Sequence, residues 1–116
     1  MLVVYPVDTS AFCAGDLREW PSMSQLVAIL NGSGLHTIVG KHSIRIEECS
    51  DFVFEGFGGD SKPCIDASAE SICELHRQVR HVSEALSMAK LSHRFELYDY
   101  QDELIHYFHH EWPLDW

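Results

Sequence analysis

The chain has 116 residues, of which 46% are hydrophobic and 22% charged, enough for one domain (residues 1–116) with an apolar core and too few for two. Its 18 Asp and Glu against 8 Lys and Arg give a net charge of −10 with histidine neutral. That charge argues against binding to nucleic acid or to an anionic membrane surface, because both ligands are themselves negatively charged.

The first residues, 2–7, are apolar and rich in strand-forming types, and they predict a β-strand. No basic residue precedes this run, and Pro6 and Asp8 end it too early for a signal peptide or a membrane span. Residues 8–20 have no clean period and are predicted to form a loop with at most one helical turn. Four cysteines stand without CxxC spacing, which indicates reduced thiols in a cytoplasmic protein: Cys13, Cys49, Cys64 and Cys73.

Residues 22–32 carry the signals of a helix at both ends. Ser22 and Gln25 stand at the spacing of a capping box, and Asn31 with Gly32 supplies a stop. Four apolar residues between them share one helical face: Met23, Leu26, Val27 and Leu30.

From residue 35 the period changes from helical to alternating. Residues 35–39, 42–47 and 52–55 predict three strands, with Ile44 and Ile46 on the same face. The glycine-rich segment 56–60 that follows matches neither common phosphate-binding loop, so it predicts a turn.

The strongest helical pattern runs from about Asp66 to Lys90, with Asp66 or Ser68 as the N-cap. Its apolar positions are spaced by three and four residues and require a sheet to pack against: Ile72, Leu75, Val79, Val82, Leu86 and Ala89.

Residues 94–98 alternate as a strand with Phe95 and Leu97 inward, whereas residues 102–112 are ambiguous. As a strand, the latter segment would set three side chains beside Phe95 and Leu97: Leu104, His106 and Phe108. As a helix, it would align Leu104 or Ile105 with Phe108 and Trp112. We favour the strand, because Ile, Tyr and Phe prefer pleated surfaces and the preceding turn is short. The element order predicts an α+β fold: a mostly antiparallel sheet of about five to six strands with two helices packed on one face.

Three histidines and a glutamate near the end are the first candidates for metal ligands: His106, His109, His110 and Glu111. On a strand, His106 and His110 share a face but stand too far apart to chelate one ion alone. On a helix they would align, but the HExxH pattern is absent. The sequence also lacks a GxSxG elbow and any local Cys–His signature. We therefore predict no catalytic residue, no metal and no other cofactor.

The C-terminal charge pattern predicts a binding surface. No basic residue follows Arg94, while carboxylates alternate with Tyr and Trp rings. Rings serve as anchors and carboxylates attract a basic protein partner, so six residues form the candidate surface: Tyr98, Asp99, Tyr100, Asp102, Glu103 and Trp112. The alternative is a solvated acidic face with its aromatic rings half-buried in the core.

In size, acidity and α+β order, the chain resembles the small immunity proteins of bacterial toxin–immunity systems. Its ending, HRFELYDYQDELIHYFHHEWP (93–113), is similar in style to the C-terminal hairpins of such proteins. The resemblance implies a protein-binding inhibitor that neutralises a basic partner such as a toxin domain. Two other functions remain open: a small metal-dependent enzyme that uses the C-terminal histidines, and a structural domain that forms a homodimer or larger homo-oligomer.

Overall fold

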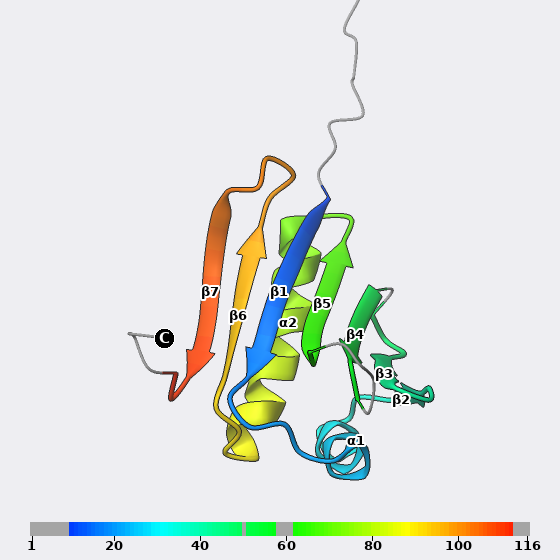
Figure 1. Cartoon of the computed structure of the whole chain (residues 1–116). Coiled ribbons are helices and arrows are strands. Elements are labelled where there is room, and N and C mark those ends of the chain that lie inside the picture. Colours follow the sequence, from blue (N-terminus) through cyan, green and yellow to red (C-terminus); the bar gives the residue numbers. More distant parts are fainter. Residues whose placement is uncertain (1–9, 50, 58–61, 113–116) are drawn as a thin grey trace, which may run out of the picture.

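The computed structural model describes residues 10–49, 51–57 and 62–112. These residues form two helices and seven strands (Figure 1), in the order β1 (Ala11–Leu17), α1 (Met23–Gly32), β2 (Thr37–Val39), β3 (Ser43–Ile46), β4 (Asp51–Glu55), β5 (Cys64–Ala69), α2 (Ile72–Met88), β6 (His93–Tyr98) and β7 (Leu104–His110). The strands pair antiparallel in one sheet, ordered β2-β3-β4-β5-β1-β6-β7. The α+β prediction is confirmed, with more strands than expected. The strand predicted at residues 2–7 lies outside the described residues.

The strand β1 lies in the middle of the sheet, between β5 and β6, where the sequence predicted a loop. Its sequence, AFCAGDL, contains no β-branched residue, which is why its strand character was missed. Gly15 is required by packing: a Cβ atom there would lie 2.5 Å from Cδ1 of Phe95 on β6. Small residues in β1 therefore make room for the aromatic core.

The helix α1 begins and ends as predicted. The Ser22 hydroxyl accepts a hydrogen bond from the Gln25 backbone N–H (3.2 Å), and the Gln25 side-chain oxygen accepts one from the Ser22 N–H (2.9 Å). Leu26 and Leu30 of this helix are fully buried, in the same core cluster as Ile44 of β3. The capping box thus fixes the start of a helix whose apolar face closes one end of the core.

The helix α2 starts later than predicted. Its N-cap is Ser71, whose hydroxyl accepts a hydrogen bond from the Glu74 N–H (3.2 Å). Asp66 and Ser68, the predicted caps, instead lie in β5, so that prediction was wrong. The predicted apolar stripe is confirmed, and four of its members have no exposed surface: Leu75, Val79, Val82 and Leu86.

One face of the sheet packs on α2, and the core lies between them (Figure 1). Phe95 of β6 contacts Phe52 of β4 edge-to-face, with ring centroids 6.2 Å apart. In the part of the chain that the structure describes, no helix combines the length and apolar character needed to cross a membrane.

The ambiguous segment 102–112 contains the strand β7, as we favoured. His106 lies opposite Leu97 and Phe108 opposite Phe95, as predicted. Leu104, however, lies opposite Tyr98, because the register shifts between Leu97 and Tyr98. This irregularity corrects the predicted place of Leu104 beside Leu97.

Candidate functional site

The face of the sheet opposite α2 carries the side chains that alternate with the core residues, and we call it the open face. None of the described helices packs on it. Strand pairing brings together residues that are far apart in sequence: Ala14 of β1 lies between Asp66 of β5 and Glu96 of β6, and Tyr107 of β7 lies opposite Glu96. The central position of β1 is what joins the N-terminal and C-terminal parts of this face.

An apolar patch occupies the hairpin end of the open face. The rings of Phe12 on β1 and Tyr98 on β6 stack with their centroids 5.4 Å apart. Ile105 and Tyr107 of β7 extend the patch with 40% and 43% of their surface exposed, and Leu104 is 54% exposed. We define the apolar patch as these five residues; exposed apolar clusters of this kind are typical of binding surfaces.

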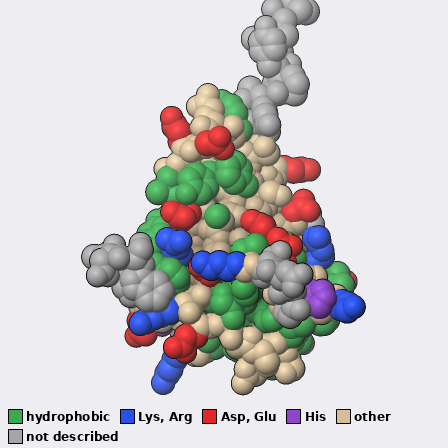
Figure 2. Space-filling view, in the orientation of Figure 1, with side chains coloured by type: hydrophobic (Ala, Val, Ile, Leu, Met, Phe, Trp, Pro, Cys, Tyr) green, Lys and Arg blue, Asp and Glu red, His purple; other side chains and the backbone are tan. Residues whose placement is uncertain are grey.

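Carboxylates surround this patch. Figure 2 looks onto the open face and shows hydrophobic side chains toward the hairpin end with acidic side chains around them. The strands place five carboxylates on this face, Asp16, Asp51, Glu55, Asp66 and Glu96, against two guanidinium groups, Arg45 and Arg94. Burial and then the nearby Glu96 carboxylate raise the pKa of the Tyr98 hydroxyl above its ordinary value of 10. The hydroxyl is therefore a neutral hydrogen-bonding group near pH 7.

The β6–β7 turn is held by Asp99. Its carboxylate accepts hydrogen bonds from the backbone N–H groups of Gln101 (2.8 Å) and Glu103 (3.0 Å). Asp102 adopts a left-handed conformation (φ 63°), which Asp tolerates better than most residues. Tyr100, 48% exposed, and Asp102 are therefore presented together at the tip of the hairpin.

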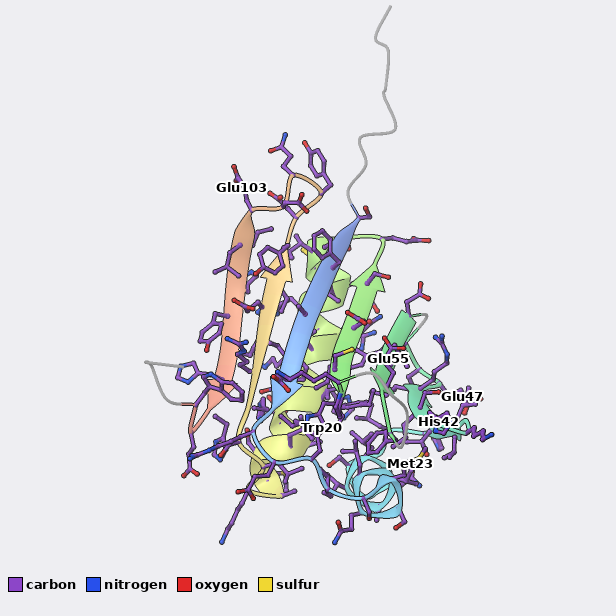
Figure 3. The ribbon with its side chains drawn as sticks, viewed as in Figure 1. Trp20, Met23, His42, Glu47, Glu55 and Glu103 are labelled. Atoms are coloured by element: carbon purple, nitrogen blue, oxygen red, sulfur yellow. The ribbon has the colours of Figure 1, made fainter. Side chains whose placement is uncertain are left out.

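The predicted surface divides into two parts. Residues 98–103 lie together at the hairpin end of the sheet, where Figure 3 shows Glu103. Trp112 follows the other end of β7, is 9% exposed, and has the Arg94 guanidinium carbon 5.0 Å from its ring centre. The structure thus brings five of the six predicted residues together and leaves Trp112 apart.

A second acidic feature lies on the open face farther from the hairpin. The Cys64 thiol is 3.7 Å from both a Glu55 and an Asp66 carboxylate oxygen, and one donor atom from each residue lies within 4.8 Å of the others. Glu55 and Asp66 share a hydrogen bond, and this contact, followed by burial, raises the pKa of the Glu55 carboxyl. The three groups could supply oxygen and sulfur ligands to a divalent cation.

The thiols are poor nucleophiles in this setting. Burial raises the pKa of Cys13 to about 12 and that of Cys49 to about 11. For Cys64, burial and then the neighbouring Asp66 and Glu55 carboxylates raise the pKa to about 11. All three thiols stay protonated at neutral pH, whereas the thiolate is the reactive form.

The three C-terminal histidines do not converge on one point. The His106 ring lies 4.5 Å from that of His76 on α2, centroid to centroid, and the His110 ring lies 5.9 Å from that of His93 on β6. His109 is on the open face, stacked on Tyr107. Among the described residues, no metal-ligand group of three or more includes any of them.

A separate hollow of about 500 Å³ lies beside α1. Its lining is largely apolar: Glu19, Trp20, Pro21, Gln25, Ala28, Ile29 and Leu91. With one carboxylate and one amide, it offers an apolar surface but no set of groups for catalysis.

Sequence reasoning found the acidic hairpin but missed Phe12, Glu55 and Asp66 as parts of the same surface. Phe12 belongs to β1, where the sequence predicts a loop, and Asp66 stands at a position where the sequence predicts a helix cap. Comparison with protein-family models, curated proteins and solved structures found no match to the chain.

Proposed function

We propose that the protein is a protein-binding inhibitor of the immunity type, which neutralises a basic partner through the hairpin end of its open face. The observation that carries this proposal is the apolar patch of Phe12, Tyr98, Leu104, Ile105 and Tyr107 among carboxylates on a helix-free sheet face. A net charge of −10 adds long-range attraction toward a positively charged protein.

The two kinds of group have different roles in this proposal. Carboxylates at the margin, such as Asp102 and Glu103, attract the partner over distance and raise the association rate. Exposed rings, such as Tyr100 and Tyr107, lose water on contact and hold the complex together. Trp112 is outside the proposed surface, because its ring is already covered.

The first experiment tests the charges. The purified chain is immobilised and exposed to lysate of the source organism, alongside a double variant, Asp102→Lys with Glu103→Lys. A matched control, Glu19→Lys with Glu47→Lys, makes the same change in net charge at exposed positions away from the hairpin; Figure 3 shows Glu47 and Glu103 at opposite ends of the sheet. We expect a basic protein that the wild type and the control retain and the hairpin variant loses.

The second experiment measures that protein's binding kinetics. Reversal of the two hairpin charges should slow association about tenfold at low salt. Added salt should remove most of the difference, since screening acts within about 10 Å at 0.1 M. Tyr100→Ala should instead speed dissociation at every salt concentration, by an amount equivalent to about 2 kcal/mol. If association is indifferent to salt and to these charges, the hairpin is not the binding site.

A functional assay separates an inhibitor from an ordinary binding protein. The captured partner is expressed in a bacterial host with and without the chain. We expect the partner alone to arrest growth and coexpression to restore it, with weaker rescue by the hairpin variant. A partner that is harmless on its own would contradict the immunity-type function while leaving the binding surface intact.

A further inference from the structure

The outer edge of β7 is the longest unpaired strand edge in the described sheet. β7 spans Leu104–His110 and pairs only with β6, whereas the strand at the opposite edge, β2, spans Thr37–Val39. Proteins usually protect such edges with lysine, proline, a bulge or a very short strand. Apart from the register shift near its start, β7 has none of these features.

The charge pattern favours a second copy of this chain as the occupant of that edge. Two molecules that each carry a charge of −10 repel one another over most of their surface. From Leu104 to His110, however, the sequence LIHYFHH contains no Asp, Glu, Lys or Arg. At a pH where histidine is neutral, two copies that pair along β7 therefore oppose no like charges within the strand, and the nearest carboxylates, those of Glu103 and Glu111, lie beyond its two ends.

We propose that two copies pair through β7 in antiparallel fashion, with the two-fold axis at Tyr107. This inference does not rest on the proposed function, although Tyr107 belongs to both surfaces. Tyr107 is the middle residue of β7, so this register uses the strand symmetrically and places Tyr107 opposite the same residue of the second copy. An isologous contact of this kind closes as a dimer and leaves no further β7 edge exposed.

The side chains also fit this register. His106 of one copy lies opposite Phe108 of the other, and Ile105 lies opposite His109. Each pair joins an imidazole to an apolar side chain, and His106 and Phe108 lie on the same face, because both rings contact His76 of α2. Cross-strand contacts between directly opposed side chains are the main side-chain contribution to sheet pairing. Both open faces stay on the same side of the enlarged sheet.

Sedimentation velocity at pH 8 tests the dimer. One pairing strand makes a small interface, so we use about 100 μM protein to populate a weak association. Tyr107→Lys would bring two ammonium groups together at the axis. Ile38→Lys on β2, at a position 53% exposed, is the matched control at the other edge. We expect twice the monomer mass of 13.3 kDa for the wild type and the control, and the monomer mass for Tyr107→Lys.

Each contrary result overturns the proposal. A monomeric wild type shows that nothing pairs with β7, and a Tyr107→Lys variant that remains dimeric places the contact elsewhere. Both substitutions replace exposed side chains. Because dimer formation itself raises the thermal midpoint, the midpoints and far-ultraviolet circular dichroism spectra are compared at a dilution where all three proteins are monomeric, and matching values there establish that the variants are folded.

Cross-linking tests the register separately. In a Cys73→Ser background, which removes the exposed cysteine, Tyr107→Cys would set two thiols opposite each other across the axis. Antiparallel pairs have Cα atoms about 4.5–5.5 Å apart, within the range that a disulfide spans. Under mild air oxidation we expect a covalent dimer for Tyr107→Cys and much less for the control Ile38→Cys. Equal cross-linking of the two variants overturns the proposed axis.

Discussion

His93 is a polar side chain with no exposed surface, and both of its ring nitrogens have partners. Nδ1 lies 2.8 Å from the Leu91 carbonyl oxygen, which only accepts, so Nδ1 carries the proton. In the neutral ring, Nε2 accepts a hydrogen bond from the Ser83 hydroxyl, 2.7 Å away. Burial disfavours the charged imidazolium and lowers the pKa of His93, so the ring is held in its neutral form.

That lowered pKa predicts a loss of stability in mild acid. The unfolded chain binds a proton at the ordinary histidine pKa of 6.5, whereas folded His93 resists protonation. The free energy of unfolding should therefore fall as the pH drops through 6.5 toward the lower folded pKa. Urea unfolding at pH 7.5 and 5.5 measures this slope.

The matched variants are His93→Gln and His109→Gln, a buried and an exposed histidine of neighbouring strands. His93→Gln should be less stable at pH 7.5 and have a shallower pH slope. Some slope should remain, because burial also lowers the pKa of His76. An identical slope in the two variants would mean that His93 is not the titrating group.

At the scale of elements, α2 is the main support of the sheet, because its stripe packs against the central strands. Leu75→Ala and Leu86→Ala should each lower the free energy of unfolding by about 2–5 kcal/mol, through lost burial and the cavity left behind. Met88→Ala, at a position 83% exposed, is the control and should change it little. Denaturant midpoints that stay unchanged in both leucine variants would contradict this packing.

The same elements explain how far the sequence could predict the fold. Long periodic patterns and a capping box identified both helices, and alternation identified β3, β4 and β6. The strands β1 and β5 were missed for physical reasons. β1 uses small residues to fit beneath Phe95, and β5 carries Asp66 and Ser68, residue types common at helix caps, on its solvent-facing side.

The candidate site was predictable only where it is local in sequence. The hairpin residues 98–103 are consecutive, so their acidic and aromatic pattern could be read directly. The remainder of the open face depends on β1 lying between β5 and β6. Because that order comes from long-range pairing, no local pattern indicates that Phe12 stacks on Tyr98.

At the scale of the whole molecule, a net charge of −10 means that folding brings some carboxylates close to one another, and their repulsion opposes folding. Glu55 and Asp66 lie on adjacent strands and face the same side. Their contact raises the pKa of Glu55 above its ordinary value of 4.5, so the folded protein holds a proton there more tightly than the unfolded chain. The acidic face that would attract a basic partner therefore carries a stability cost near neutral pH.

The sign of that pKa shift leads to the last prediction. Stability contributed by a group with a raised folded pKa is present in acid and is lost as the pH rises above 4.5 through the folded value. Asp66→Asn removes the repulsion, so it should stabilise the protein more at pH 7 than at pH 4. Asp51→Asn, on β4 and on the same face, removes an equal charge outside this pair and is the control. In urea unfolding at pH 7 and low salt, Asp66→Asn should raise the free energy of unfolding more than Asp51→Asn does. About 0.5 M salt should reduce this difference, because salt screens the repulsion between the carboxylates. Equal effects of the two substitutions would instead attribute the gain to net charge alone.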